Sequence, residues 1–203
     1  VCIEGRGGTV SNCVIRNCQG ATMDCYGGGA CLLVANALVT HCVITNCYVS
    51  SSSPAGSAEH GGLGVYMSAG SLRDSLIAFC GSNGTSYDSG LKGQDGTIAI
   101  RGGTVVNCTV ASNVNATCSG IRARGGKVIN TIISANRVTT SVLGDTATVM
   151  AGKVAGDSVS TTFENCLADK DVDGKFAVED PAQTFLRPGN GNFRLRTGSK
   201  AID

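Results

Sequence analysis

A short sequence unit returns several times along this chain. The stretch GGTVSNCVIRNC at residues 7–18 is followed by ANALVTHCVITNC at 35–47 and by RGGTVVNC at 101–108. When the units are aligned on one apolar anchor residue, they recur about every 23 to 35 residues, a period typical of solenoid proteins. The aligned anchors are Val10, Val39, Leu72, Val105, Val128 and Phe163.

Positions counted from this anchor keep their chemistry from unit to unit. Two residues later the side chain is polar: Asn12, His41, Asp74, Asn107, Asn130 and Asn165. Three residues later it is small: Cys13, Cys42, Ser75, Cys108, Thr131 and Cys166. Eight residues later it is Cys, Asn or Asp: Cys18, Cys47, Cys80, Asn113, Asn136 and Asp171. Asn suits a bend between strands, because it tolerates left-handed backbone and its side chain can bond along a stack.

A second apolar segment precedes each anchor and alternates apolar with polar residues, as a β-strand does. Its members seven residues before the anchor are Ile3, Leu32, Val65, Ile98 and Ile121. We therefore expect these five residues to stack on one another as a second column.

The pattern predicts an all-β fold, a right-handed parallel β-helix of about six to seven coils. Apolar alternation broken by Gly and Asn excludes helices, and parallel strands joined by crossovers favour the right-handed form. The 29 glycines and only 3 prolines fit many short strands with tight turns. We expect residues 1–177 to form the coils and residues 178–203 to form a C-terminal tail that packs on the last coil.

Charge and hydropathy narrow the classes of partner. With a net charge of +1, the chain lacks the excess of positive charge that attracts nucleic acid. No stretch approaches the ~20 consecutive apolar residues that span a bilayer. The chain opens at Val1 inside a repeat unit, and we interpret it as part of a longer protein.

Units such as residues 7–18 resemble those of bacterial right-handed parallel β-helix proteins, including the polymorphic outer-membrane-protein-like group. The tail, with Asp180-Pro181, Phe193-Arg194-Leu195 and a final Ala-Ile-Asp, resembles the choice-of-anchor-type segment of secreted bacterial β-helix proteins. It departs from that pattern at Thr197 and Lys200, where proline is commoner. The resemblance implies this fold and a secreted, extracellular or outer-surface location.

Because this scaffold carries many activities, function has to be inferred from particular residues. The regular columns favour a non-enzymatic module that serves as a structural stalk, adhesin or assembly unit. Its partner would be a polysaccharide or another protein subunit, including a copy stacked head to tail. The alternative is a polysaccharide lyase or glycosidase acting on acidic polysaccharide.

The candidate residues for such a substrate are mostly basic. Four arginines, three of them just before an anchor, could form a stripe that binds uronates: Arg73, Arg101, Arg122 and Arg124. Asp74 is the weak catalytic candidate, since carbohydrate hydrolysis relies on carboxylates.

One acidic stretch suggests a metal, and calcium is the cofactor considered. Asp169, Asp171 and Asp173, followed by Gly174, match the opening of a calcium-binding loop. Position twelve of that loop would be Asp180 in place of the usual Glu. The alternative interpretation is a solvated acidic turn.

The chain has 11 cysteines, an odd number, with no Cys-x-x-Cys motif. If the units stack, Cys13 lies beside Cys42 and Cys18 beside Cys47, about 4.8 Å apart and within reach of a disulfide. The pattern leaves open whether these pairs are bonded or form a ladder of free thiols.

Overall fold

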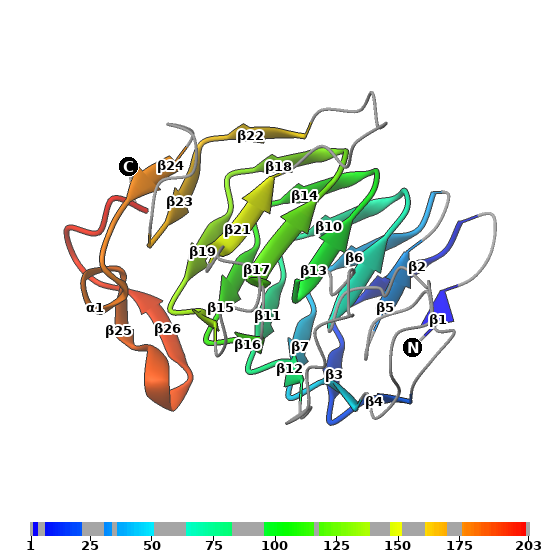
Figure 1. Ribbon diagram of the computed structural model, residues 1–203, viewed down its shortest axis with the longest axis horizontal. Coiled ribbons are helices and arrows are strands. Elements are labelled where there is room, and N and C mark those ends of the chain that lie inside the picture. Colours follow the sequence, from blue (N-terminus) through cyan, green and yellow to red (C-terminus); the bar gives the residue numbers. More distant parts are fainter. Residues whose placement is uncertain are drawn as a thin grey trace, which may run out of the picture.

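In the computed structural model, the strands of successive repeats lie side by side in long sheets (Figure 1). The structure describes residues 2–3, 7–21, 31–33, 36–50, 64–82, 96–115, 118–138, 147–151, 161–169 and 176–201. Four sheets, named here A to D, run along the stack, and each coil contributes one short strand to most of them. The fold is a parallel β-helix, as the repeat pattern predicts.

Sheet A holds β1 (Cys2–Ile3), β5 (Cys31–Leu33), β9 (Val65–Met67), β13 (Ile98–Ile100), β17 (Cys118–Ala123) and β21 (Ala147–Ala151). Sheet B holds β2 (Thr9–Ser11), β6 (Leu38–Thr40), β10 (Ser71–Arg73), β14 (Thr104–Val106), β18 (Lys127–Ile129) and β22 (Thr162–Glu164). Sheet C holds β3 (Val14–Arg16), β7 (Val43–Thr45), β11 (Leu76–Ala78), β15 (Thr109–Ala111), β19 (Ile132–Ser134), β23 (Cys166–Ala168) and β24 (Phe176–Val178). Sheet D holds β4 (Gln19–Ala21), β8 (Tyr48–Ser50), β12 (Gly81–Ser82), β16 (Val114–Asn115) and β20 (Arg137–Val138).

The anchor column is confirmed by the register of sheet B. Leu72 pairs with Val39 on one side and with Val105 on the other, and the pairing continues to Val10 and to Phe163 through the same column. Leu72, Val39 and Val105 are completely buried. Because strand residues alternate between faces, the residues on either side of each anchor face outward.

The second predicted column is right in three coils and wrong in two. Val65, Ile98 and Ile121 do pair in register. Leu32, however, pairs with Cys2 and Tyr66, and Ile3 pairs with Leu33. The cause is the spacing of the strands in the sequence: more residues separate β1 from β2, and β5 from β6, than separate β9 from β10. Added residues in a turn shift the strand before it relative to the anchor.

The core is a single apolar cluster that runs along the stack. Inward residues of sheets A, B and C meet there, and small residues fill the corners between sheets. At the C-terminal end, the ring of Phe176 packs on that of Phe163, with centroids 4.9 Å apart. This aromatic pair closes the core at that end.

The C-terminal tail is the only part with helices among the described residues. It forms α1 (Pro181–Thr184), β25 (Phe185–Arg187), the short 3-10 helix η1 (Pro188–Asn190) and β26 (Asn192–Leu195), with β25 and β26 antiparallel. The tail begins at the last coil, where Val178 pairs with Ala168, and it also runs along the side of earlier coils (Figure 1). The ring centroids of Phe193 and Phe79 lie 5.7 Å apart, and the Ser112 hydroxyl donates to the Pro188 carbonyl.

Candidate functional site

The bend between sheets B and C carries the predicted column of polar residues. All six have positive φ, between 48° and 54°: Asn12, His41, Asp74, Asn107, Asn130 and Asn165. Left-handed backbone is unfavourable for most residues, and Asn and Asp are the usual exceptions. The prediction that Asn is selected for the bend is therefore confirmed.

The side chains of this column bond to one another along the stack. Asn130 Nδ2 donates to Asn107 Oδ1 (3.2 Å), and Asn107 Nδ2 donates to Asp74 Oδ1 (3.0 Å). His41 instead interacts within its own coil, through Nδ1 and the Thr40 hydroxyl (2.9 Å). The carboxylate of Asp74, the catalytic candidate, thus ends a structural ladder.

Polar residues three and eight positions after the anchor accept hydrogen bonds from backbone N–H groups at the bends. The Cys42 N–H donates to Ser75 Oγ (3.0 Å), and the Cys80 N–H donates to Asn113 Oδ1 (2.8 Å). Asn136 Oδ1 in turn accepts from the Asn113 N–H (3.0 Å). Buried N–H groups need partners, so a Ser, Thr or Asn in one coil stabilises the coil before it.

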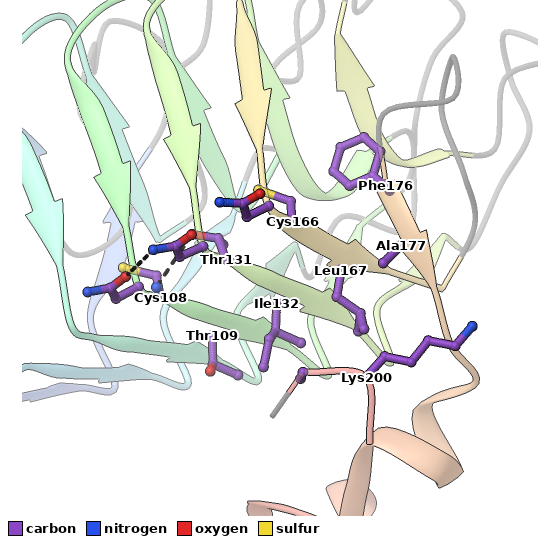
Figure 2. Close-up of a pocket in the computed structure, with 13 residues that line it drawn as sticks. Cys108, Thr109, Thr131, Ile132, Cys166, Leu167, Phe176, Ala177 and Lys200 are labelled. Carbon is purple, nitrogen blue, oxygen red and sulfur yellow. Dashed lines mark hydrogen bonds between the residues drawn. The ribbon is translucent and has the colours of Figure 1, made fainter. Parts of the chain in front are cut away.

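A groove of about 940 Å³ follows this bend near the C-terminal end (Figure 2). One row along it is Cys108, Thr131 and Cys166, and a second, outward row on sheet C is Thr109, Ile132 and Leu167 (Figure 2). The ladder amides, Phe176 and Ala177 of β24, and the tail residues Lys200 and Ala201 form the rest of the lining. Lys200 Nζ donates to the Val178 carbonyl (2.9 Å). The groove thus combines amide and ammonium donors with an aliphatic surface.

The structure brings together three of the four predicted arginines. Arg101 and Arg124 occupy the same turn position on consecutive coils, because Ile100 and Ala123 before them are paired. Arg122 lies on sheet A, between two inward-facing residues, and so faces outward. Arg73 lies at the other edge of sheet B, beside Asp74, and is separated from the other three by the width of that sheet.

The predicted calcium ligands are described only in part. Asp169 Oδ2 accepts from the Ala135 N–H (2.8 Å), and burial raises the pKa of Asp169. Asp180, the expected twelfth position of the loop, caps α1 by accepting from the Ala182 N–H (2.7 Å). Asp171 and Asp173 lie outside the described residues. Within the described part of the chain, no three His, Cys, Asp or Glu side chains are arranged to hold a metal ion.

The cysteines whose side chains the structure describes carry free thiols: Cys13, Cys18, Cys42, Cys47, Cys80, Cys108, Cys118 and Cys166. Strand pairing places the two predicted pairs on adjacent coils, because Val14 pairs with Val43 and Gln19 with Tyr48. Cys13 and Cys42, and likewise Cys18 and Cys47, are thus neighbours on adjacent coils, as the stacking predicts.

A second bend column was missed by the sequence analysis. It lies between sheets C and D, with φ between 52° and 58°: Asn17, Asn46, Phe79, Ser112 and Ala135. The side chains of these residues have no chemical property in common, so residue type alone could not reveal the column. Their common spacing of seven residues from the anchor was the available clue.

A buried carboxylate holds separate parts of the tail together, and the sequence analysis missed it too. Glu179 Oε2 accepts from the hydroxyls of Thr184 (2.8 Å) and Ser199 (2.7 Å), and Oε1 accepts from the Lys200 N–H (2.9 Å). Burial alone would raise the pKa of Glu179, but these hydrogen bonds hold it below its usual range. Three donors make the charged form the stable one.

Replacing Glu179 by Gln is therefore expected to lower the free energy of unfolding at pH 7 by about 1.5 to 3 kcal/mol. Since the folded pKa is depressed, the stabilisation is present above the unfolded pKa of about 4.3 and is lost as pH falls through the folded pKa. Urea denaturation of both proteins between pH 7 and pH 3 should show the difference shrinking towards acid. A difference that stays constant with pH would contradict the role given to the carboxylate.

Comparisons with known proteins give no assignment: no protein-family model, curated protein or solved structure matches this chain. None of the helices among the described residues is long and apolar enough to cross a membrane. Function has to be argued from the geometry above.

Proposed function

We propose that this chain is a non-enzymatic β-solenoid module, a rigid stalk, adhesin or assembly unit of a secreted or surface-exposed bacterial protein. The resemblance of the chain's repeats and tail to polymorphic outer-membrane-protein-like β-helix proteins supports this proposal. The observation that carries it is the use of the polar columns. Side chains such as Asn107 and Asn113 bond to neighbouring coils, which stabilises stacking.

The first coil offers a surface for assembly. Strands β2, β3 and β4 are the terminal members of sheets B, C and D, and no described strand lies on their outer edges. The Val43 N–H of the second coil donates to the Cys13 carbonyl of the first coil, so the equivalent Val14 N–H of the first coil points away from the stack. Val14 is also 65% exposed. A strand edge with unpaired N–H groups is a template for another strand.

For this chain of 203 residues, we propose that a second copy of the chain occupies this edge. At the opposite end Phe176 and Phe163 close the core, so a head-to-tail stack would meet a capped surface. Two copies that meet through their first coils form instead a closed dimer with two-fold symmetry.

Val14→Pro tests the assembly, because proline removes the N–H that would donate across the interface. We expect concentration-dependent dimerisation of the natural chain in sedimentation experiments, and a dissociation constant raised at least about tenfold in the variant. Val14→Thr, which keeps the N–H and the β-branched shape, is the matched control and should dimerise. A natural chain that stays monomeric at every concentration, or equal association of both variants, would overturn this interface.

The groove supports a second candidate, binding or cleavage of an acidic polysaccharide. Asn and Lys side chains donate to sugar hydroxyls and carboxylates, and Asn130, Asn165 and Lys200 line the same surface. Incubation with uronate polymers, followed by ultraviolet absorbance of unsaturated products and by reducing-sugar release, tests the catalytic form. Unchanged polymer that also fails to bind in calorimetry excludes this candidate for the polymers tried.

A further inference from the structure

Three thiols occupy one column on consecutive coils: Cys18, Cys47 and Cys80. The strands that follow them, β4, β8 and β12, pair in register, which holds the three residues one above another. Cys47 is the middle member of this column and lies next to both Cys18 and Cys80. A disulfide can join neighbouring residues of such a column, because paired strands lie about 4.8 Å apart.

The solvent exposure and the thiol pKa of the cysteines differ along this column. Cys18 is half-buried at the first coil, whereas Cys47 and Cys80 are 0% and 1% exposed. The hydrogen bond from Cys80 lowers the pKa of Cys47 to about 6, although burial opposes it. Burial and the neighbouring Cys47 raise the pKa of Cys18. A bulky reagent therefore meets Cys18 first, with the thiolate of Cys47 behind it.

We propose that Cys18 and Cys47 form a thiol–disulfide exchange site for small-molecule disulfides. Cys18 gives its proton to the Cys47 thiolate as its sulfur attacks one sulfur of the small disulfide, whose S–S bond breaks and releases one thiolate; Cys47 then loses that proton to solvent. Cys47 then attacks Cys18 Sγ and displaces the second small thiolate. The two cysteines lose two protons and two electrons, which the small disulfide gains as two thiols. The product joins the first two coils covalently at the open edge.

The Cys13–Cys42 pair is a matched comparison on the same two coils. Its thiols are directed to backbone carbonyls, Cys13 to Ser11 O at 3.1 Å and Cys42 to Thr40 O at 3.2 Å. The corresponding contacts are longer for Cys18 (3.7 Å, to Arg16 O) and for Cys47 (3.4 Å, to Thr45 O). The thiols of the Cys18–Cys47 pair are thus less tightly held by the carbonyls of their own coils.

The test uses glutathione disulfide on the folded chain of 203 residues at pH 7. Trypsin cuts after Arg16 and so places Cys13 and Cys18 on different peptides, and chymotrypsin separates both from Cys47 by cutting after Tyr26 and Leu38. Tandem mass spectrometry then distinguishes Cys42 from Cys47 within their shared peptide. Non-reducing peptide mapping should then find Cys18 joined to Cys47, with no glutathione on either. Cys13 should be recovered free or as a stable glutathione adduct, never joined to Cys42.

Variants separate the two steps. Cys47→Ser should retain one glutathione on Cys18, since the resolving thiolate is gone, while Cys42→Ser should still form the Cys18–Cys47 bond. Cys80→Ser should form the same bond with its pH dependence moved to higher pH. A persistent adduct on Cys18 of the natural chain, or a Cys13–Cys42 bond formed as readily, would overturn the proposal. Mapping of the natural chain decides the matter even where a variant fails to fold.

Discussion

Replacing Leu72 by Asp is expected to abolish cooperative folding. Leu72 is completely buried between Val39 and Val105 in the anchor column. Losing a large apolar side chain from a core costs about 2 to 5 kcal/mol, and burying an unpaired carboxylate adds several kcal/mol. The sum is comparable with the whole stability of a typical domain, about 5 to 15 kcal/mol. Circular dichroism during urea titration should therefore show no cooperative transition.

Ser71→Asp is the matched control for this substitution. Ser71 precedes Leu72 in the same strand, faces outward and pairs with Leu38 and Thr104. The same charge placed there should change the free energy of unfolding by less than about 1 kcal/mol. Similar urea midpoints for the two variants would contradict the inward direction of the anchor column.

Gly103→Ala is expected to have the second largest effect. Gly103 has φ +88° in the turn between sheets A and B, where L side chains are strained. A Cβ there would contact the carbonyl oxygen of Gly70 and lie 2.9 Å from that of Ala69, both in the preceding coil. Strain of the left-handed backbone together with separation of two coils should lower the free energy of unfolding by about 3 to 5 kcal/mol.

Gly189→Ala is the matched control for Gly103→Ala, because it makes the same replacement of glycine by alanine at a position without close neighbours. A Cβ at Gly189 meets nothing within 4 Å, and the residue lies in the tail. Its substitution should change the urea midpoint by the equivalent of less than about 0.5 kcal/mol. Equal effects at both glycines would mean that the coils are not in close contact at this turn.

The sequence predicted those parts of the fold in which every coil has the same steric or backbone requirement at the same position. The corner after the anchor needs a small residue, so Cys42, Ser75 and Cys108 are interchangeable there. The first bend needs left-handed backbone, which favours Asn. Such demands leave the same residue type at the same spacing, and a single sequence is enough to reveal them.

Features supported by other parts of the chain were not predictable in this way. Phe79 adopts left-handed backbone in the second bend, where the tail residue Phe193 packs against its ring. The hydrogen bonds of Glu179 depend on Ser199, which only the folded tail brings close. The register of sheet A in the first coils depends on turn length, which the anchor alignment does not include.

The account as a whole depends on equivalent side chains lying above one another in successive coils. Methyl-labelled NMR tests this most directly, through nuclear Overhauser effects between Leu72 and the anchors of the coils on either side. We expect strong methyl contacts from Leu72 to both Val39 and Val105, each of which is distant in sequence but paired with it in sheet B. Contacts from Leu72 to residues of its own coil alone would contradict the stacked arrangement.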